Sequence, residues 1–569
     1  MPIARLLLCC VFIVLVHTGI AWFIHQPQDV GPDVPAGKLM SLSFAPFREG
    51  YSPLDEVFPP PEHVDEDLRL LSGKTYGVRT YASLGGMQPV PELARKHGLT
   101  VTQGAWLGSI AKDNAAEVEA LIASANTHPD VVKRVIVGNE VLLRGEMNVD
   151  RLIDYIRQVK RAVKQPVSYA DVWSMYMKHP QLFNEVDFIT IHILPYWEDE
   201  PIAVERAGEH LETIVRQVED EARGIAPGKP ILIGESGWPS AGRQRGMAAP
   251  GVVNAARFTR DMIQVTTRHG FDYNIVEAFN QPWKSHLEGV VGANWGLLSA
   301  DREPVFPLTG PVQENPDWRV NLTVALLIWL AVVAVFRKTL IPLDTLPLIA
   351  FLLVSQLMCS AWVSLNDVLW YTSYTTLQRS YTVFMSVANA VLGCWLLLRM
   401  QSLLAGAGDD VAVADKLRKG YLLFIAIALF KTFNLAIAGR YLSFPLEQFA
   451  IPVIGILGLS LAGVVSRHRG GRPVFAFDRL TGGLGSGSND YWLAWVLGGA
   501  IIAMIAGETV AFLQGRDFVQ AHPTLAQGLP VALHYTLANR QLLTWLFCLL
   551  ILALPFCRSR RPPRPENVF

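Results

Sequence analysis

The order of apolar and polar residues divides the chain into two regions of different kinds. Between residues 25 and 318, short apolar runs rich in β-branched residues alternate with longer segments in which apolar residues recur at helical spacing. Outside that region, the apolar runs are long enough to cross a bilayer. The pattern therefore predicts a water-exposed α/β domain joined to a membrane-embedded helical domain.

Eight of the short runs have the length and composition of β-strands. Amphipathic segments such as 115–124 and 149–162 lie between them, so strands and helices alternate along the chain. This count and alternation predict a (β/α)8 TIM barrel over residues 38–312, preceded by a linker at residues 25–37. The runs are Leu39–Ala45, Tyr76–Tyr81, Thr100–Ala105, Val135–Gly138, Pro166–Ala170, Phe188–Ile193, Pro230–Glu235 and Tyr273–Phe279.

Eight long apolar runs predict membrane-spanning helices. The first gives an N-terminal anchor at residues 1–24, and the other seven give an all-α helical bundle at residues 320–557, followed by a basic tail at residues 558–569. A cleaved signal peptide is the alternative for the first run, but the residues after it, His25 to Gln28, offer no small-residue cleavage site. The runs are Leu6–Ile24, Val320–Phe336, Leu346–Leu365, Val383–Leu398, Tyr421–Ala438, Phe449–Val465, Tyr491–Leu513 and Leu542–Phe556.

Charge is distributed unevenly between the two regions. Residues 25–318 carry 28 Lys and Arg against 39 Asp and Glu, whereas the rest of the chain carries 21 against 11. If the N-terminus lies in the cytoplasm, eight spans place fifteen Lys and Arg in cytoplasmic segments and four in the short outer loops. This bias follows the positive-inside rule, and it predicts that the barrel lies outside the cytoplasm and the C-terminus inside.

Two glutamate motifs stand at the ends of predicted strands. Val137-Gly-Asn-Glu140 ends the fourth strand, and Gly234-Glu235-Ser-Gly-Trp-Pro-Ser240 ends the seventh. Because the carboxyl ends of barrel strands meet at one face, where such enzymes keep their chemistry, we expect Glu140 and Glu235 to lie together. A pair of carboxylates is what cleavage of a glycosidic bond requires.

Aromatic and amide side chains follow the same and neighbouring strands. Aromatic rings stack on the C–H faces of a sugar ring, and amide or ammonium groups bond to its hydroxyls, so this set is suited to binding a sugar chain. The candidate substrate-binding residues are Trp106, Asn139, His192, Tyr196, Trp197, Trp238, Phe279, Gln281, Trp283 and Lys284.

The sequence gives little indication of thiol, metal or phosphate-binding chemistry. All six cysteines fall in or beside the long apolar runs, so the barrel has no thiol for catalysis or metal binding. The histidines show no metal-ligand spacing, and we expect no metal, cofactor or nucleic-acid partner. The stretch Gly482–Ser488 lacks the Gly-Lys-Ser/Thr of a phosphate-binding loop and predicts a cytoplasmic linker.

The segment Lys229-Pro-Ile-Leu-Ile-Gly-Glu235-Ser-Gly-Trp-Pro-Ser-Ala-Gly242 resembles the signature of glycoside hydrolase family 17, the β-1,3-glucanase clan. Val137-Gly-Asn-Glu140, Glu277-Ala-Phe-Asn-Gln-Pro-Trp-Lys284 and Gly292-Ala-Asn-Trp-Gly-Leu-Leu298 resemble other motifs of that family. The resemblance implies that Glu140 is the acid/base and Glu235 the nucleophile of a retaining mechanism, and that Asn139 binds the sugar 2-hydroxyl.

The whole layout is similar to bacterial inner-membrane proteins of that family linked to β-glucan synthesis and branching. This similarity implies a periplasmic barrel, a lipid bilayer around the bundle and a separate membrane glucan synthase as partner. One position departs from the family: Gln281 stands where many members have a glutamate, so a third carboxylate would have to come from Glu277 or Glu288.

Three functions stay open. The chain is a glucanosyltransferase that remodels or branches (β-1,3/β-1,6) an envelope glucan, an endo-β-1,3-glucanase, or an inactive glucan-binding or export module. The intact pair of glutamates argues against the third. Because a plain hydrolase needs one anchor rather than eight spans, the first is favoured over the second.

Overall fold

The structure is a computed structural model that describes residues 2–406, 411–466, 480–481 and 491–557. It divides into two compact units. Pro27–Glu314 forms one unit, and Met1–Gln26 together with Asn315–Phe569 forms the other. The expected linker Gly482–Ser488 and the expected tail at residues 558–569 lie outside the described residues.

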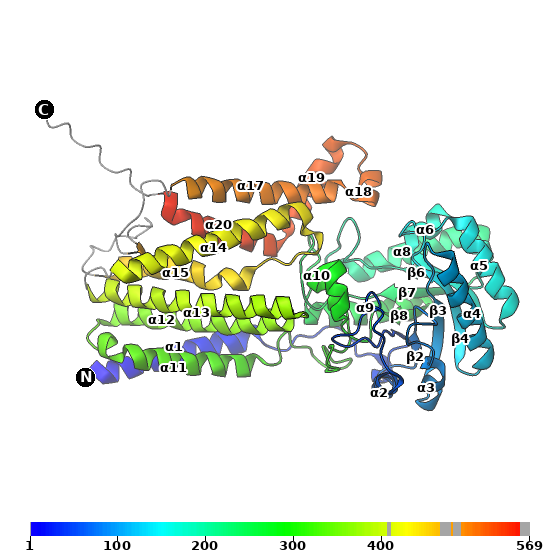
Figure 1. Cartoon of the computed structure of the whole chain (residues 1–569), viewed down its shortest axis with the longest axis horizontal. Helices are drawn as coiled ribbons and strands as arrows, with labels where there is room; N and C mark the ends of the chain where they lie inside the picture. Colours follow the sequence, from blue (N-terminus) through cyan, green and yellow to red (C-terminus); the bar gives the residue numbers. More distant parts are fainter. Residues whose placement is uncertain (1, 407–410, 467–479, 482–490, 558–569) are drawn as a thin grey trace. The chain divides into compact units, whose positions relative to one another are not determined.

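The first unit contains a closed barrel of eight parallel strands, which follow one another around the barrel in chain order (Figure 1). The expected (β/α)8 fold is therefore confirmed. The strands are β1 (Leu42–Ser43), β2 (Gly77–Arg79), β3 (Thr100–Ala105), β4 (Val132–Asn139), β5 (Val167–Val172), β6 (Ile189–His192), β7 (Ile231–Ser236) and β8 (Asp272–Ile275).

Each strand lies within or overlaps the run predicted for it, but β8 is shorter than expected. It ends at Ile275, whereas the apolar run continues to Phe279. The backbone of the following residues finds other partners: the Glu277 amide donates to the carbonyl of Trp295 (2.9 Å) and the Ala278 amide to that of Ser43 (2.9 Å). The regular strand therefore ends at Ile275, and the residues after it bond to Trp295 and to Ser43 of β1.

Helices pack around the barrel because each carries one apolar stripe. In α5, Leu152, Ile153, Ile156 and Val159 are buried at helical spacing, and the side chain of Asn148 caps the first turn. The helices of this unit are α2 (Pro61–Leu71), α3 (Val90–Lys96), α4 (Ala111–Thr127), α5 (Val149–Ala162), α6 (Trp173–Lys178), α7 (Leu182–Glu185), α8 (Val204–Ile225), α9 (Val252–His269) and α10 (Ser285–Ala293).

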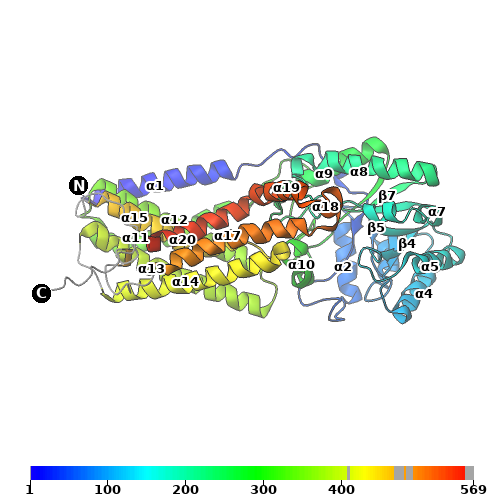
Figure 2. The ribbon, with the colours of Figure 1, turned by 90° about the horizontal axis from the view of Figure 1, so that it is seen from above.

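The second unit is helical, and its long apolar helices run side by side (Figures 1 and 2). Among the described residues, eight helices are long and apolar enough to cross a membrane, and they overlap the eight predicted runs. These helices are typical of a multi-pass membrane protein. They are α1 (Pro2–Ile24), α11 (Trp318–Leu340), α12 (Thr345–Tyr371), α13 (Thr376–Ala405), α14 (Val411–Ala438), α15 (Leu446–Val465), α17 (Trp492–Leu513) and α20 (Arg540–Cys557).

The first helix, α1, packs as a member of this bundle. Its Leu6 and Ile13 are buried in the apolar core of the unit. Arg5 Nη2 donates to the carbonyl of Ile341 (3.0 Å), and His17 Nε2 lies 3.3 Å from Ser360 Oγ of α12. Two further helices, α18 (Arg516–Ala521) and α19 (Leu525–Ala538), connect α17 to α20 and were not anticipated from the sequence.

Candidate active site

At the end of β4, the side chains of Asn139 and Glu140 turn toward the barrel axis. Gly138 has a φ of +89° and Glu140 a φ of +52°, so left-handed residues flank Asn139 on both sides. The pairing of β4 with β5 shifts register between Ile136 and Asn139, and the Glu140 amide donates to the carbonyl of Ala170 (2.8 Å). A register shift of this kind re-aims side chains at the rim of a barrel.

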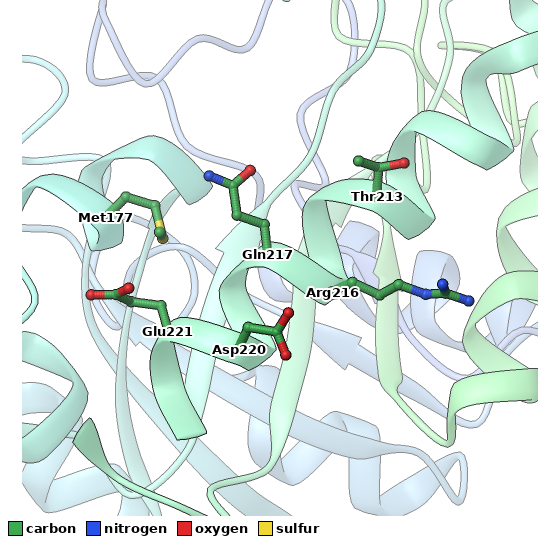
Figure 3. Close-up of a pocket in the computed structure, with 6 residues that line it drawn as sticks. All are labelled: Met177, Thr213, Arg216, Gln217, Asp220 and Glu221. Atoms are coloured by element: carbon green, nitrogen blue, oxygen red, sulfur yellow. The ribbon is translucent and has the colours of Figure 1, made fainter. Parts of the chain in front are cut away.

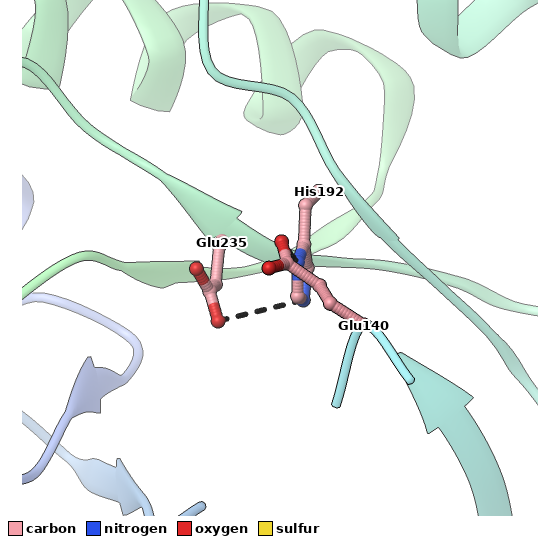
Figure 4. A group of neighbouring side chains, drawn as sticks. All are labelled: Glu140, His192 and Glu235. Atoms are coloured by element: carbon pink, nitrogen blue, oxygen red, sulfur yellow. Dashed lines mark hydrogen bonds and ion pairs between the residues drawn. The ribbon is translucent and has the colours of Figure 1, made fainter. Parts of the chain in front are cut away.

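Glu235 and His192 complete a compact group with Glu140 (Figure 4). His192 Nδ1 lies 2.8 Å from Glu140 Oε1, and its Nε2 lies 3.6 Å from Glu235 Oε1. One oxygen of each carboxylate and one nitrogen of the imidazole all lie within 4.8 Å of one another. The Glu140 side chain is 23% exposed and that of Glu235 11%, whereas His192 has no exposed side-chain surface. Both carboxylates therefore keep some exposed surface, and the imidazole has none.

Arg79, at the end of β2, connects Asn139 with Gly234 and Glu235. Its Nη2 donates to Asn139 Oδ1 (2.6 Å), and its Nη1 donates to the carbonyl of Gly234 (2.7 Å) and to Glu235 Oε1 (3.3 Å). Arg79 is only 1% exposed. A Cβ at Gly234 would lie 2.4 Å from Thr190 Cγ2, so only glycine fits there. A buried guanidinium thus lies directly beside the Glu235 carboxylate.

The pKa of Glu140 lies below its usual value. Burial raises this pKa, but the hydrogen bond from His192 and the charges of His192, Arg144 and Arg79 lower it by more. An acid/base glutamate on its own needs the opposite shift to hold a proton near neutral pH. The pKa of Glu140 is thus shifted away from what this role requires. The cause is the imidazole at 2.8 Å.

The three residues Glu140, His192 and Glu235 have the donor types of a metal site. Arg79 opposes that use, because its Nη1 lies 3.4 Å from His192 Nε2 and 3.3 Å from Glu235 Oε1. The guanidinium thus supplies a positive charge beside the two atoms that would share an ion. The arrangement suits acid–base and nucleophilic chemistry without an ion.

A second group of charges lies in the segment after β8. Lys284 Nζ donates to both oxygens of Glu277, at 2.9 and 3.1 Å. Glu277 is fully buried. Burial raises its pKa to about 7, with Lys284 opposing and Glu235 and Glu288 adding to the shift. Burial likewise raises the pKa of Glu288. Glu277 and Glu288 are the two residues that could supply the carboxyl missing at Gln281. Both therefore interact electrostatically with Glu235.

Trp106, Trp197 and Trp283 are the partly exposed aromatics among the predicted sugar contacts. Trp106 is 43% exposed, and the Arg144 guanidinium lies over its ring, 4.4 Å from the centroid. Trp197 stacks on Trp295 at 6.3 Å between ring centroids. Trp283 Nε1 donates to Gln281 Oε1 (2.8 Å). Partly exposed rings at a strand-end face are suited to stacking on sugars.

Four other predicted sugar contacts are buried. Tyr196 and Phe279 have no exposed surface, Trp238 is 2% exposed, and Gln281 is fully buried. The Tyr196 hydroxyl donates to the carbonyl of Arg243, and Trp238 Nε1 to that of Ala249 (2.9 Å). Gln281 Nε2 donates to the carbonyl of Ala45 (2.7 Å). These side chains support the mouth of the barrel and position the partly exposed rings.

Two hollows lie away from this group. One is on the outside of the barrel, where Thr213, Arg216, Gln217, Asp220 and Glu221 of α8 lie beside Met177 of α6 (Figure 3). The other, of about 300 Å³, opens at the amino ends of the strands, beside Ser41, Thr100 and Asp272. Neither is lined by Glu140 or Glu235, so the strand-end group is the candidate active site.

Residues 42–296 match the family described as the BtgE/BtgC glycoside hydrolase domain. The chain is 28% identical over 272 residues to a glucan 1,3-beta-glucosidase of Arthroderma benhamiae, covering 45% of this chain and 85% of that protein. It is 25% identical over 272 residues to the probable beta-glucosidase btgE of Neosartorya fischeri, covering 46% of each. Thus the match spans less than half of the second relative.

Among solved structures, the chain is similar to the glycoside hydrolase family 17 β-1,3-glucanosyltransferase of Rhizomucor miehei. The sequence identity is 27%, the TM-score is 0.41, and the match covers 47% of this chain and 95% of that one. The family match falls on the barrel. The barrel is thus the part of this chain that is similar to glycoside hydrolase domains.

Proposed function

We propose that the barrel cleaves β-1,3-glucan by a retaining double displacement, with Glu235 as nucleophile and Glu140 as acid/base. The observation that carries the proposal is the short separation of the two carboxylates, whose oxygens approach within 4.8 Å. Retaining glycosidases hold their carboxyl groups about 5–5.5 Å apart, whereas inverting ones leave about 6.5–9.5 Å for a water molecule. The separation of the two carboxylates therefore supports the retaining arrangement over the inverting one.

In the first step, Glu235 attacks the anomeric carbon while Glu140 protonates the leaving oxygen, and a glycosyl-enzyme forms. Arg79 donates to Glu235 and to Asn139 Oδ1, which leaves the Asn139 amide group to donate to the sugar 2-hydroxyl. In the second step, Glu140 removes a proton from the incoming hydroxyl, and the bond to Glu235 breaks. The acceptor is water in hydrolysis and a sugar in transfer.

The substrate class is inferred from the relatives and from the aromatic rings. The Arthroderma relative bears the name glucan 1,3-beta-glucosidase. Trp106, Trp197 and Trp283 expose ring surface near the carboxyl ends of the strands. These rings, with Lys284 and the buried residues that hold them, are suited to a neutral glucan chain.

Transfer is favoured over hydrolysis by the architecture of the chain. Eight long apolar helices exceed what anchoring a hydrolase requires. A retaining glycosyl-enzyme can be intercepted by any well-held acceptor hydroxyl, and the aromatic rings give such an acceptor a place to bind. We infer a glucanosyltransferase that remodels or branches an envelope glucan, including β-1,6 linkages, made by a separate membrane synthase.

The charge bias of the loops supports an orientation for the protein. With α1 retained as an anchor, the segments rich in Lys and Arg face the cytoplasm and the barrel faces outward. We propose a bacterial inner-membrane protein with a periplasmic barrel at residues 38–312, an anchor at residues 1–24 and a bundle at residues 320–557.

The test is to incubate the full chain in detergent with a millimolar β-1,3-gluco-oligosaccharide and to size the products over time by mass spectrometry. We expect products longer than the substrate, and linkage analysis then identifies new bonds. Glu235→Gln serves as the inactive control. Products that are only shorter, even at high acceptor concentration, would replace transfer by endo-β-1,3-glucanase activity. No turnover would leave the inactive binding or export module.

A further inference from the structure

The imidazole of His192 lies between the two carboxylates of the site and is closer to Glu140. Its Nδ1 is 2.8 Å from Glu140 Oε1, a hydrogen-bond distance, whereas its Nε2 is 3.6 Å from Glu235 Oε1. His192 has no exposed side-chain surface, so it does not present a face to a sugar. Its position suits a partner of Glu140 better than the substrate contact expected from the sequence.

We propose that His192 is a positioning residue that stores the catalytic proton for Glu140, so that the pair, rather than the carboxyl alone, titrates as the acid. The proposal rests on the retaining function proposed above. When two groups at hydrogen-bond distance share a proton, the apparent pKa at which they lose it belongs to the pair and not to either group. Because an imidazole holds its proton to higher pH than a carboxyl does, the pair keeps an acid available at neutral pH.

The proton balance over one turnover is as follows. Before the reaction, the pair holds one proton more than a neutral imidazole and a carboxylate. When the glycosidic bond breaks, this proton passes from His192 Nδ1 through Glu140 to the leaving oxygen, and Glu235 bonds to the anomeric carbon. When the acceptor attacks, its hydroxyl proton passes to Glu140, the bond to Glu235 breaks, and the proton returns to the pair.

The charged groups around the pair come from five elements. Two are cationic and favour the carboxylate form of Glu140; Arg79, whose Nη1 lies 3.4 Å from His192 Nε2, also opposes protonation of the imidazole. Three are carboxyls that favour the protonated pair. The five groups are Arg79 from β2, Arg144 from the loop after β4, Asp171 from β5, Glu235 from β7 and Glu288 from α10. All five remain in a His192 variant, so a change in the pH profile reports the loss of the imidazole itself.

The experiment compares His192→Asn and His192→Phe with the wild-type full chain in detergent. Asparagine keeps a donor near the place of Nδ1 but cannot release the proton. The substrates are a β-1,3-gluco-oligosaccharide, whose leaving group needs an acid, and the same sugar with a dinitrophenyl leaving group, which needs none. The readout is kcat/KM against pH, with the thermal unfolding midpoint of each variant.

With the oligosaccharide, we expect the basic limb of the kcat/KM–pH profile to move to lower pH by about 1–2 units in both variants. This shift corresponds to the difference in pKa between a carboxyl and an imidazole. Both variants then fall about 10- to 100-fold below wild type above neutral pH and approach it in acid. With the dinitrophenyl substrate, the variants keep the wild-type profile. His97→Gln is the matched control, because His97 Nε2 pairs with Asp65 Oδ1 at 2.7 Å far along the chain from the site; it leaves both profiles unchanged.

Three results overturn the proposal. One is an equal, pH-independent loss on both substrates, which is what a misfolded or merely packing variant gives. Another is an unchanged basic limb in both variants. The third is restoration of the wild-type limb by asparagine, which would reduce His192 to a hydrogen-bond donor. A wild-type protein that cleaves neither substrate would instead contradict the proposed function itself.

Discussion

At the scale of single residues, Arg79 connects the parts of the active site. Its guanidinium is buried and donates to Asn139, to the carbonyl of Gly234 and to Glu235. We expect Arg79→Ala to lower kcat/KM by about 100- to 1000-fold, the usual effect of removing a preorganised donor. We also expect it to lower the free energy of unfolding by about 3–5 kcal/mol, because a buried carboxylate loses its partner.

The matched control is Arg95→Ala. Arg95 also bonds a carboxylate, Asp130, at 2.6 Å, but both side chains are exposed, so the pair contributes little. Kinetics and thermal unfolding of the two variants separate the predictions. Activity within tenfold of wild type in Arg79→Ala would contradict the role given to the guanidinium.

The sequence located the proposed reacting residues but not the network that holds them. Glu140 and Glu235 were found because each ends an apolar run. Arg79 was missed, although a charge inside the short strand Gly77–Arg79 was a signal: a buried strand keeps an arginine only where it has partners. Tyr196 and Trp238 were grouped with exposed rings because no sequence pattern tells which face of a loop aromatic packs inward.

At the scale of elements, the end of β4 depends on a left-handed turn. Gly138 has a φ of +89°, and a Cβ there would meet Leu107 and Tyr169 at 3.4 Å. We expect Gly138→Ala to cost about 1–2 kcal/mol of stability from backbone strain. Because Asn139 and Glu140 follow directly, kcat should fall as well.

Gly228→Ala is the control for that variant. Gly228 has a φ of +78°, and nothing lies within 4 Å of its Cβ position, in the loop before β7. Both alanine variants should lower the thermal unfolding midpoint, and only Gly138→Ala should lower kcat. Equal kcat values in the two variants would show that the turn does not position Glu140.

The carboxyls at the ends of β5 and β8 make stability depend on pH. Burial raises the pKa of Asp171 to about 6 and that of Glu277 to about 7. In the unfolded chain both groups titrate near pH ~4, so the folded state binds their protons more tightly. Their stabilising contribution is therefore complete below about pH 4 and is lost as the pH rises through about 7.

We expect the thermal unfolding midpoint to fall between about pH 5 and pH 7.5. The fall should be smaller in Glu277→Gln, which removes one of the two titrating groups. Circular dichroism melts in detergent across this range measure both slopes. A slope in Glu277→Gln as steep as that of wild type would exclude Glu277 as a source.

Periodicity predicted the elements better than their ends. The eight strands and eight long helices could be predicted from apolar runs, because apolar residues are buried in the protein core or in the membrane. The early end of β8 could not be predicted, because it depends on Ser43 and Trp295 accepting hydrogen bonds from distant parts of the chain. The helices α18 and α19 are short and only partly apolar, so they gave no membrane-length signal.

At the scale of the whole molecule, orientation in the membrane follows from the charge bias of the loops. We expect a reporter fused after Pro316 to be active only outside the cytoplasm, and one fused after Arg418 only inside. Paired reporters that require opposite compartments, an alkaline phosphatase and a fluorescent protein, measure this. The reverse pattern would overturn the topology and the placement of the barrel outside the cytoplasm.

The account as a whole depends on a covalent intermediate on Glu235. A β-1,3-gluco-oligosaccharyl fluoride with fluorine at the sugar C2 slows both chemical steps, while its leaving group favours the first, so the glycosyl-enzyme accumulates in a retaining enzyme. Peptide mass spectrometry of the treated full chain then locates the sugar. The predicted result is one added 2-fluoro-oligosaccharyl group on the peptide that contains Glu235, absent in Glu235→Gln. An active wild-type enzyme with no adduct, or with the adduct on Glu140 or Glu277, would contradict the account.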